Sequence, residues 1–151
     1  AGYVFRPINN WILNKIQVHR NKDANADFYR KGRLAAIGMA SKIKAGEVVG
    51  LTGDQLLREG INVPFFKIKT PTPQAAAVMA LKWNTPIYMV RIERFKGIRF
   101  KMTIEDKLKI PKNIDKEKAT YEITKLISSR IEEWITDKPE QWLWAHRRWG
   151  K

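Results

Sequence analysis

Two spacings of apolar residues run through the sequence and divide it into expected helices and strands. Apolar positions three and four residues apart predict helices at four places: 11–19, 33–44, 75–83 and 116–135. Short apolar and aromatic runs predict strands at four others: 3–5, 47–52, 87–95 and 98–104. Lys96 and Gly97 would join the last two strands as a hairpin. The stretch 21–32 is polar and mixed, so we expect a loop there.

Residues that satisfy free backbone groups mark several helix ends. Asn9 or Asn10 fits the N-cap of the first helix, and Thr70 or Thr72 fits that of the third. Gly46 fits the C-cap of the second helix. Because helices alternate with strands and a hairpin follows, we expect the α/β class, with a mixed sheet flanked by helices.

Basic residues outnumber acidic ones, with 29 Lys and Arg against 15 Asp and Glu and a net charge of +14. Such an excess favours polyanionic partners: nucleic acid, anionic lipid headgroups or an acidic carrier protein. The longest apolar run, 75–81, is far too short to cross a membrane, and no signal-peptide pattern is found. The chain starts without methionine in a strand-like run, which we expect of a segment of a larger fold.

The composition also excludes several kinds of functional site. There is no cysteine, which excludes disulfides, thiolate zinc sites and a cysteine nucleophile. Two histidines are too few for a metal site with several imidazoles, and no glycine-rich phosphate loop or nucleophile elbow occurs. Nucleic-acid-binding motifs are missing as well. We therefore expect no metal, no cofactor and no nucleic acid partner.

The two histidines are candidates for acid–base chemistry. His19 and Asp23 are four residues apart, which would let a carboxylate orient an imidazole on one face of a helix. Asp23 stands where that helix is expected to end, however, and a solvated helix end explains the pair better. His146 has no carboxylate near it in the sequence, so we expect it to be structural or to face a phosphate.

Polar residues at strand ends are candidates for a binding site. Asp54 and Gln55 follow the buried strand expected at 47–52, at the sheet edge where active sites of α/β proteins gather. A hydrogen bond between Asp54 and the backbone of the next loop explains the position equally well. Arg6 ends the first strand, where its planar fork suits an anionic oxygen, although a surface salt bridge fits slightly better.

Aromatic and basic residues gather at the end of the chain. Three tryptophans stand beside Arg147 and Arg148 within 142–149, a mixture that suits a phosphate site, stacked bases or a bilayer interface. The alternative is that the tryptophans are core residues and both arginines lie outside. On the expected hairpin the basic residues fall on both faces, which is typical of a solvated surface.

Five blocks resemble the lipid A biosynthesis acyltransferase family, which comprises lauroyl and myristoyl transferases. They are FRPINN at 5–10, KG at 31–32, GEVVGL at 46–51 followed by DQ at 54–55, GINVPFF at 60–66 and QWLWAHRRW at 141–149. Their spacing agrees across nearly the whole chain, and the last block is distinctive. The resemblance implies a glycerolipid-acyltransferase-like fold, with residues 1–151 as the C-terminal half of one such domain and with an incomplete sheet.

The resemblance also implies an activity, its partners and its setting. A fatty acyl chain would pass from acyl carrier protein or acyl-CoA to a hydroxyl of a Kdo-bearing lipid A precursor in lipopolysaccharide biosynthesis. The setting would be the cytoplasmic face of the bacterial inner membrane, with this chain bound peripherally to the anionic membrane surface.

The family's catalytic motif, His-x-x-x-x-Asp/Glu, has no counterpart at the expected place, upstream of the first strand. His19 and Asp23 are one residue too close together and lie downstream. We therefore expect the chain alone to be inactive, with a separate N-terminal half supplying the motif. Lys67 is a second departure, because the family usually has glycine after Pro-Phe-Phe.

Carried over residue by residue, the resemblance places seven residues at the site. Asp54 would support catalysis. The others would bind substrate or support its binding: Arg6, Asn9, Asn10, Gln55, Arg147 and Arg148. The role of Glu140, just before the last block, stays open. The competing hypothesis is a non-catalytic basic module that binds anionic lipid or nucleic acid.

Overall fold

The computed structural model describes residues 1–5, 9–23, 26–30, 32–111 and 113–150. The chain divides into two compact units, residues 1–51 and 52–151, and each is described by itself. Both contain helices and strands, so the α/β class is confirmed. The assignment of the whole chain to the C-terminal half of one domain stays a prediction.

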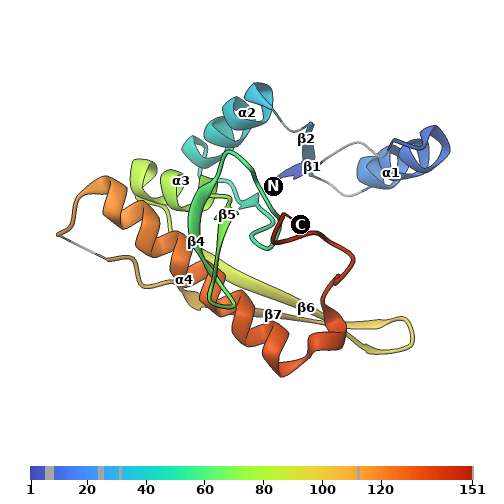
Figure 1. Cartoon of the computed structure of the whole chain (residues 1–151). Helices are drawn as coiled ribbons and strands as arrows, with labels where there is room; N and C mark the ends of the chain where they lie inside the picture. The colour runs from blue at the N-terminus through green and yellow to red at the C-terminus, as the bar shows by residue number, and fades with distance from the viewer. Residues whose placement is uncertain (6–8, 24–25, 31, 112, 151) are drawn as a thin grey trace. The chain divides into compact units, whose positions relative to one another are not determined.

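The first unit is built on a parallel sheet of three strands in the order β2-β1-β3. Strand β1 (Gly2–Phe5) lies in the middle, between β2 (Asp27–Arg30) and β3 (Val49–Gly50). Helix α1 (Trp11–Asp23) follows β1 in the chain, and α2 (Arg33–Lys44) connects β2 to β3 (Figure 1). Parallel strands need such crossovers, because a tight turn cannot return the chain in the same direction.

Asn10 lies at the start of α1, and Gly46 lies just after the end of α2. The Oδ1 atom of Asn10 accepts hydrogen bonds from the amides of Ile12 and Leu13, at 3.0 and 3.1 Å, so Asn10 is the N-cap of α1. Gly46 has a φ of 73° just after α2, a conformation that glycine adopts without steric cost. The predicted cap at Asn10 is thus confirmed, whereas the C-cap of α2 is Ala45 and not the predicted Gly46, which follows one residue later.

Two predictions about the first unit were wrong. The stretch 21–32 is not a loop: it contains the end of α1 and all of β2, whose four residues gain ladder hydrogen bonds from β1. The expected buried strand at 47–52 is only the half-buried β3, because pairing with β1 stops after two residues. Neither feature could be predicted from local composition, because the extent of β2 and of β3 depends on pairing with β1, which is distant in the sequence.

The second unit packs one long helix against a sheet and a helix, with a second hairpin alongside (Figure 1). Strands β4 and β5 form one antiparallel pair, and β6 and β7 form another. In chain order the elements are β4 (Ile61–Phe65), β5 (Ile68–Thr72), α3 (Ala75–Trp83), β6 (Tyr88–Lys96), β7 (Arg99–Lys107), α4 (Lys116–Asp137) and a 3-10 turn (Pro139–Gln141).

The core of the second unit follows the helical spacing of α4. Four isoleucines, each four residues from the next, form a buried stripe: Ile123, Ile127, Ile131 and Ile135. Phe65 of β4 and Ala77 of α3 belong to the same core. The rings of Trp142 and Trp149 lie 5.9 and 5.6 Å from that of Phe65, so the C-terminal segment closes over β4.

Sequence periodicity located the long elements of this unit correctly. Helix α4 begins at its N-cap Asp115, whose Oδ1 accepts from the amide of Lys118 at 2.9 Å. The β6–β7 hairpin turns at Gly97, which has a φ of 54°. In the described part of the chain, no helix combines the length and the apolar character that crossing a membrane requires.

The predicted cap of α3 was wrong. Thr70 and Thr72 do not cap the helix but lie buried in β5, where the Thr72 hydroxyl donates to the carbonyl of Thr70 at 2.9 Å. Helix α3 follows Gln74, which makes no side-chain capping bond. The two threonines that the sequence suggested as helix caps are therefore part of the β4–β5 pair instead.

Candidate active site

The predicted site residues are distributed over both units. Asn9 and Asn10 belong to the first unit, where Asn9 is exposed and Asn10 caps α1. Arg6 lies outside the described residues. The second unit carries the rest of the prediction, in two segments that begin at Asp54 and at Arg147.

Arg148 is the most unusual of these side chains, because it is fully buried, with 0% of its surface exposed. Its Nη2 donates to the hydroxyl of Thr72 at 2.7 Å, and its Nη1 donates to the carbonyl of Pro71 at 3.2 Å. The guanidinium carbon lies 4.6 Å from the centre of the Phe65 ring. The interpretation that both terminal arginines lie outside a tryptophan core is therefore wrong for Arg148.

A carboxylate influences this buried cation. Burial lowers the pKa of Arg148, while the negative charge of Asp54 acts in the opposite direction and favours the charged form. Among the described residues the two groups do not come within ion-pair distance, so the attraction acts at longer range. Asp54 itself is half-buried. The charge of Asp54 thus acts on a predicted residue that is far away in the sequence.

The guanidinium also keeps one unused donor. Within the described part of the chain, the Nε of Arg148 is buried without a hydrogen-bond partner. Buried donors are nearly always paired, because leaving one unpaired costs free energy. Arg148 is therefore a buried positive charge with one unpaired N–H, and the charge of Asp54 acts on it.

His146 fixes the backbone that follows Asp54. Its Nε2 accepts a hydrogen bond from the amide of Leu56 at 3.0 Å, which requires the neutral ring with Nε2 unprotonated. The predicted structural role of His146 is consistent with this bond. Sequence reasoning could not name Leu56 as the partner, because a backbone amide carries no sequence signal. His19, by contrast, is exposed on α1, and the side chain of Asp23 lies outside the described atoms.

The remaining predicted residues lie at the surface. Gln55, Glu140 and Arg147 are all exposed, so neighbouring arginines at 147 and 148 have opposite environments. Three or more acidic or imidazole groups that could share a metal ion do not gather anywhere among the described residues. The predicted residues of the second unit supply two guanidinium groups and one side-chain amide as donors, together with the carboxylate of Asp54.

Lys67, which stands where the family usually has glycine, has a left-handed backbone conformation. Phe66 and Lys67 form the two-residue turn between β4 and β5, with φ values of 49° and 65°. Both central residues of a type I′ hairpin turn need positive φ, which favours glycine. Lys67 therefore adopts the backbone conformation that a glycine would adopt there.

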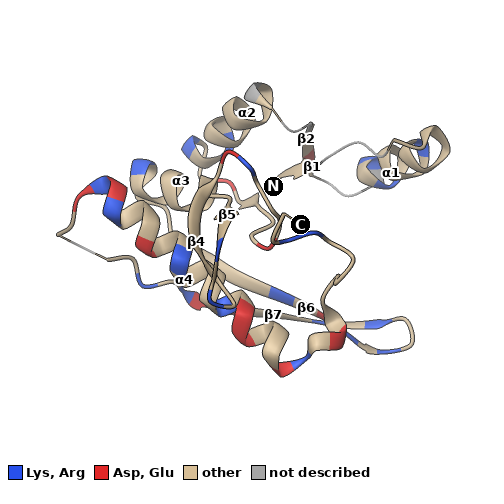
Figure 2. Ribbon diagram, viewed as in Figure 1, with Lys and Arg blue, Asp and Glu red and all other residues tan. Residues whose placement is uncertain are grey.

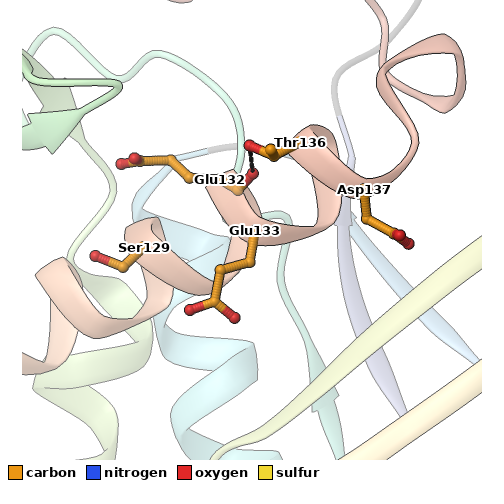
Figure 3. A pocket seen from close by; sticks show the side chains of 5 residues that line it. All are labelled: Ser129, Glu132, Glu133, Thr136 and Asp137. Atoms are coloured by element: carbon orange, nitrogen blue, oxygen red, sulfur yellow. Dashed lines mark hydrogen bonds between the residues drawn. The ribbon is translucent and has the colours of Figure 1, made fainter.

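A surface depression on α4 is not a candidate site. It is lined by five residues of one face of α4 and contains three carboxylates (Figure 3): Ser129, Glu132, Glu133, Thr136 and Asp137. The Thr136 hydroxyl bonds back to the carbonyl of Glu132 at 2.8 Å, within the helix. An open, acidic hollow repels phosphate groups, and none of the predicted site residues lines it.

Comparison with known proteins agrees with the sequence blocks. The family described as bacterial lipid A biosynthesis acyltransferase matches residues 1–151, from the first strand to the C-terminal segment. No curated protein matches the chain in a sequence comparison. Because the match extends over the whole sequence, the chain belongs to the bacterial lipid A biosynthesis acyltransferase family.

Proposed function

We propose that this chain takes part in transferring a fatty acyl group from acyl carrier protein or acyl-CoA to a hydroxyl of a Kdo-bearing lipid A precursor. The observation that supports this most strongly is the family match over residues 1–151, which indicates a lipid A acyltransferase function. The donor and the acceptor hydroxyl belong to the proposal.

The reaction needs a base and a route for one proton. The acceptor oxygen attacks the thioester carbonyl, a C–O bond forms, the C–S bond breaks, and the carrier leaves as a thiol. The base takes the hydroxyl proton and returns it to the departing sulfur. Five residues after His19 stands Ala24, and five after His146 stands Lys151, so neither histidine begins a His-x-x-x-x-Asp/Glu motif. We expect the 151 residues alone to be inactive.

Asp54 and Arg148 are the groups we place at the active site. The carboxylate of Asp54 is half-buried, and a carboxylate can accept hydrogen bonds from a substrate hydroxyl or from a protonated base. Arg148, being fully buried, would act as a positioning residue through Asp54 rather than by touching substrate. Gln55 at the same rim would contact the substrate directly.

The exposed predicted residues would bind the anionic parts of the substrates. Arg147 lies at the surface with its guanidinium available for a phosphate oxygen. Arg6, Asn9 and Asn10 are proposed to help from the first unit. The net charge of +14 suits an acidic carrier, a phosphorylated acceptor and an anionic bilayer. We place the reaction at the cytoplasmic face of the inner membrane, with the protein bound peripherally.

The test is an acyl-transfer assay with lauroyl- or myristoyl-loaded carrier protein and a Kdo-bearing lipid A precursor, followed by mass spectrometry of the lipid. One sample contains the chain alone, and another contains it with an N-terminal half that carries the catalytic motif, either coexpressed or joined. We expect product only in the second sample. A folded pair that associates but transfers nothing would contradict the proposed function. Turnover by the chain alone would contradict the expectation that it is inactive without the catalytic motif.

The competing hypothesis of a non-catalytic basic module is tested in parallel. Submicromolar nucleic-acid binding that weakens steeply with salt, together with no acyl transfer by the paired sample, would favour it.

A further inference from the structure

The loop that leads into β4 carries two of the predicted site residues, Asp54 and Gln55. Residues 52–60 are all described by the structure, and none of them belongs to a helix or a strand. The regular hydrogen bonds of a helix or a sheet therefore do not fix the backbone that carries these two side chains. Contacts with other parts of the second unit must hold it.

The backbone just before Asp54 packs against α4. Gly53 has no side chain, and a Cβ at this position would lie 3.2 Å from the Cδ1 of Ile131 and 3.3 Å from the Cγ2 of Ile127. Carbon atoms pack best at roughly 3.5–4.0 Å, so little space separates the loop backbone from the isoleucine stripe of α4. Gly53 is thus one fixed point of the loop.

The backbone two residues after Asp54 is held by hydrogen bonds. The amide of Leu56 donates to the Nε2 of His146 at 3.0 Å, and the amide of Leu57 donates to the carbonyl of Pro71 at 3.4 Å. The bond to His146 is the shorter of the two and lies nearer to the predicted site. The loop is therefore fixed on both sides of Asp54 and of the residue that follows it.

His146 is itself held in a well-anchored segment. Its amide donates to the carbonyl of Leu143 at 3.0 Å, and its carbonyl accepts from the amide of Arg148 at 2.8 Å. The side chain of Arg148 is buried, and the ring of Trp149 lies 5.6 Å from that of Phe65. Figure 2 shows basic residues on this C-terminal segment and acidic residues on the loop before β4, the two segments that the histidine connects.

The hydrogen bond of His146 also limits what its ring can do. Nε2 uses its lone pair to accept the N–H of Leu56, so in the neutral ring the proton is on Nδ1 and no free lone pair remains. A ring without a free lone pair does not take a proton from an acceptor hydroxyl. Holding the backbone beside Asp54 is the role that this geometry leaves to the ring.

We propose that His146 is a positioning residue for acyl transfer, which acts through the Leu56 amide on the loop that carries Asp54. A misplacement of about 1 Å can lower a rate by 100-fold, so releasing the loop on one side slows the reaction without removing any group that touches substrate. The charge of Asp54 also acts on Arg148, which follows His146 by two residues. The proposal rests on the proposed function, because it takes Asp54 as a site residue.

Two substitutions of similar polarity test this role. In His146→Gln the side-chain oxygen can reach the position of Nε2 and accept the Leu56 N–H, whereas in His146→Asn it ends near the position of Nδ1 and falls short. Both are assayed for acyl transfer in the chain paired with an N-terminal half that carries the catalytic motif. We expect His146→Asn to lower kcat/KM by roughly 10- to 100-fold and His146→Gln to restore most of it. His19→Asn, at an exposed position of α1, is the matched control and should keep full activity.

A double variant tests whether the effect passes through Asp54. Added to Asp54→Ala, the change His146→Asn should cost several-fold less than it costs alone, because the group that the histidine positions is already absent. A merely structural role would give the same cost in both backgrounds. Circular dichroism shows whether each variant is folded.

Three results would overturn the role of His146. They are equal costs of His146→Asn in the two backgrounds, equal losses for the asparagine and glutamine variants, and full activity in a folded asparagine variant. Unfolding of the asparagine variant would assign the bond to stability and would overturn it as well. A wild-type pair that transfers nothing contradicts the proposed function instead, so the two failures are distinguishable.

Discussion

The buried guanidinium of Arg148 donates to the hydroxyl of Thr72 at 2.7 Å and so joins the C-terminal segment to β5. Each of its two acceptors has another polar contact. The Thr72 hydroxyl also donates to the carbonyl of Thr70, and the Pro71 carbonyl also accepts from the amide of Leu57. Each of these two groups would therefore keep a polar contact if the Arg148 side chain were removed.

This relationship predicts how Arg148 variants differ. Arg148→Met keeps most of the side-chain volume and removes a costly buried charge, so we expect the free energy of unfolding to change by only about 1 kcal/mol. Arg148→Ala leaves a cavity beside Phe65 and should cost roughly 2–4 kcal/mol. Denaturant unfolding measures both, with Arg147→Met at the exposed neighbour as the control. Equal losses for the Met and Ala variants would show that the hydrogen bonds stabilise the fold.

His146 should protect one particular amide. Replacing it with alanine removes the acceptor for the Leu56 N–H, at a cost of about 1 kcal/mol. Hydrogen exchange at Leu56 should then accelerate, and the matched change His19→Ala on the exposed face of α1 should leave it unaltered. Unchanged exchange at Leu56 in the His146 variant would contradict the hydrogen bond between the Leu56 amide and His146.

The ion pair between Glu105 and Arg130 should make stability depend on pH. Hydrogen bonds from Arg130 and then from Trp134 lower the pKa of Glu105 below its ordinary 4.5, although burial opposes them. A lowered pKa means that the stabilisation is complete above pH 4.5 and is lost as the pH falls through the lowered value.

The measurement is the difference in unfolding free energy between the wild type and Glu105→Gln across this pH range. Because Arg130 is partly exposed, we expect about 1 kcal/mol at neutral pH. The difference should shrink in acid. Asp106→Asn, at an exposed position of the same strand, serves as the control. A difference that stays constant into acid would contradict the assignment.

Lys67→Gly should stabilise the protein. Lys67 has a positive φ in the turn between β4 and β5, and glycine adopts this conformation without a steric penalty, which favours the variant by about 0.5–1 kcal/mol. Lys69→Gly is the control within β5, where glycine should destabilise the strand. Thermal unfolding separates the two, and a lower melting temperature for Lys67→Gly would contradict the turn geometry.

The parts of the fold that sequence reasoning located are those decided by nearby residues. The isoleucine spacing of α4 and the glycine between β6 and β7 are local signals, and each element lies within a few residues of its prediction. Strand β2 was missed because its four residues are stabilised by β1, a distant segment. The burial of Thr70 and Thr72 likewise follows from pairing with β4.

Part of the candidate site could be predicted from the sequence, and part depends on contacts between distant segments. Resemblance to the family pointed to Asp54 and Arg148, and the structure brings the charge of one to bear on the other. That Arg148 is buried while Arg147 is exposed could not be predicted, because two adjacent arginines look alike in sequence. Their environments depend on how the C-terminal segment crosses β5.

The central claim is that Asp54, whose charge acts on the buried Arg148, belongs to the active site of an acyltransferase. The most direct test compares Asp54→Ala with Asp106→Ala in the acyl-transfer assay, using the chain paired with an N-terminal half that carries the catalytic motif. We predict that the Asp54 variant loses roughly 100-fold or more in kcat/KM, as removal of a catalytic group does. The Asp106 variant should retain its activity. Full activity in a folded Asp54 variant would contradict the account.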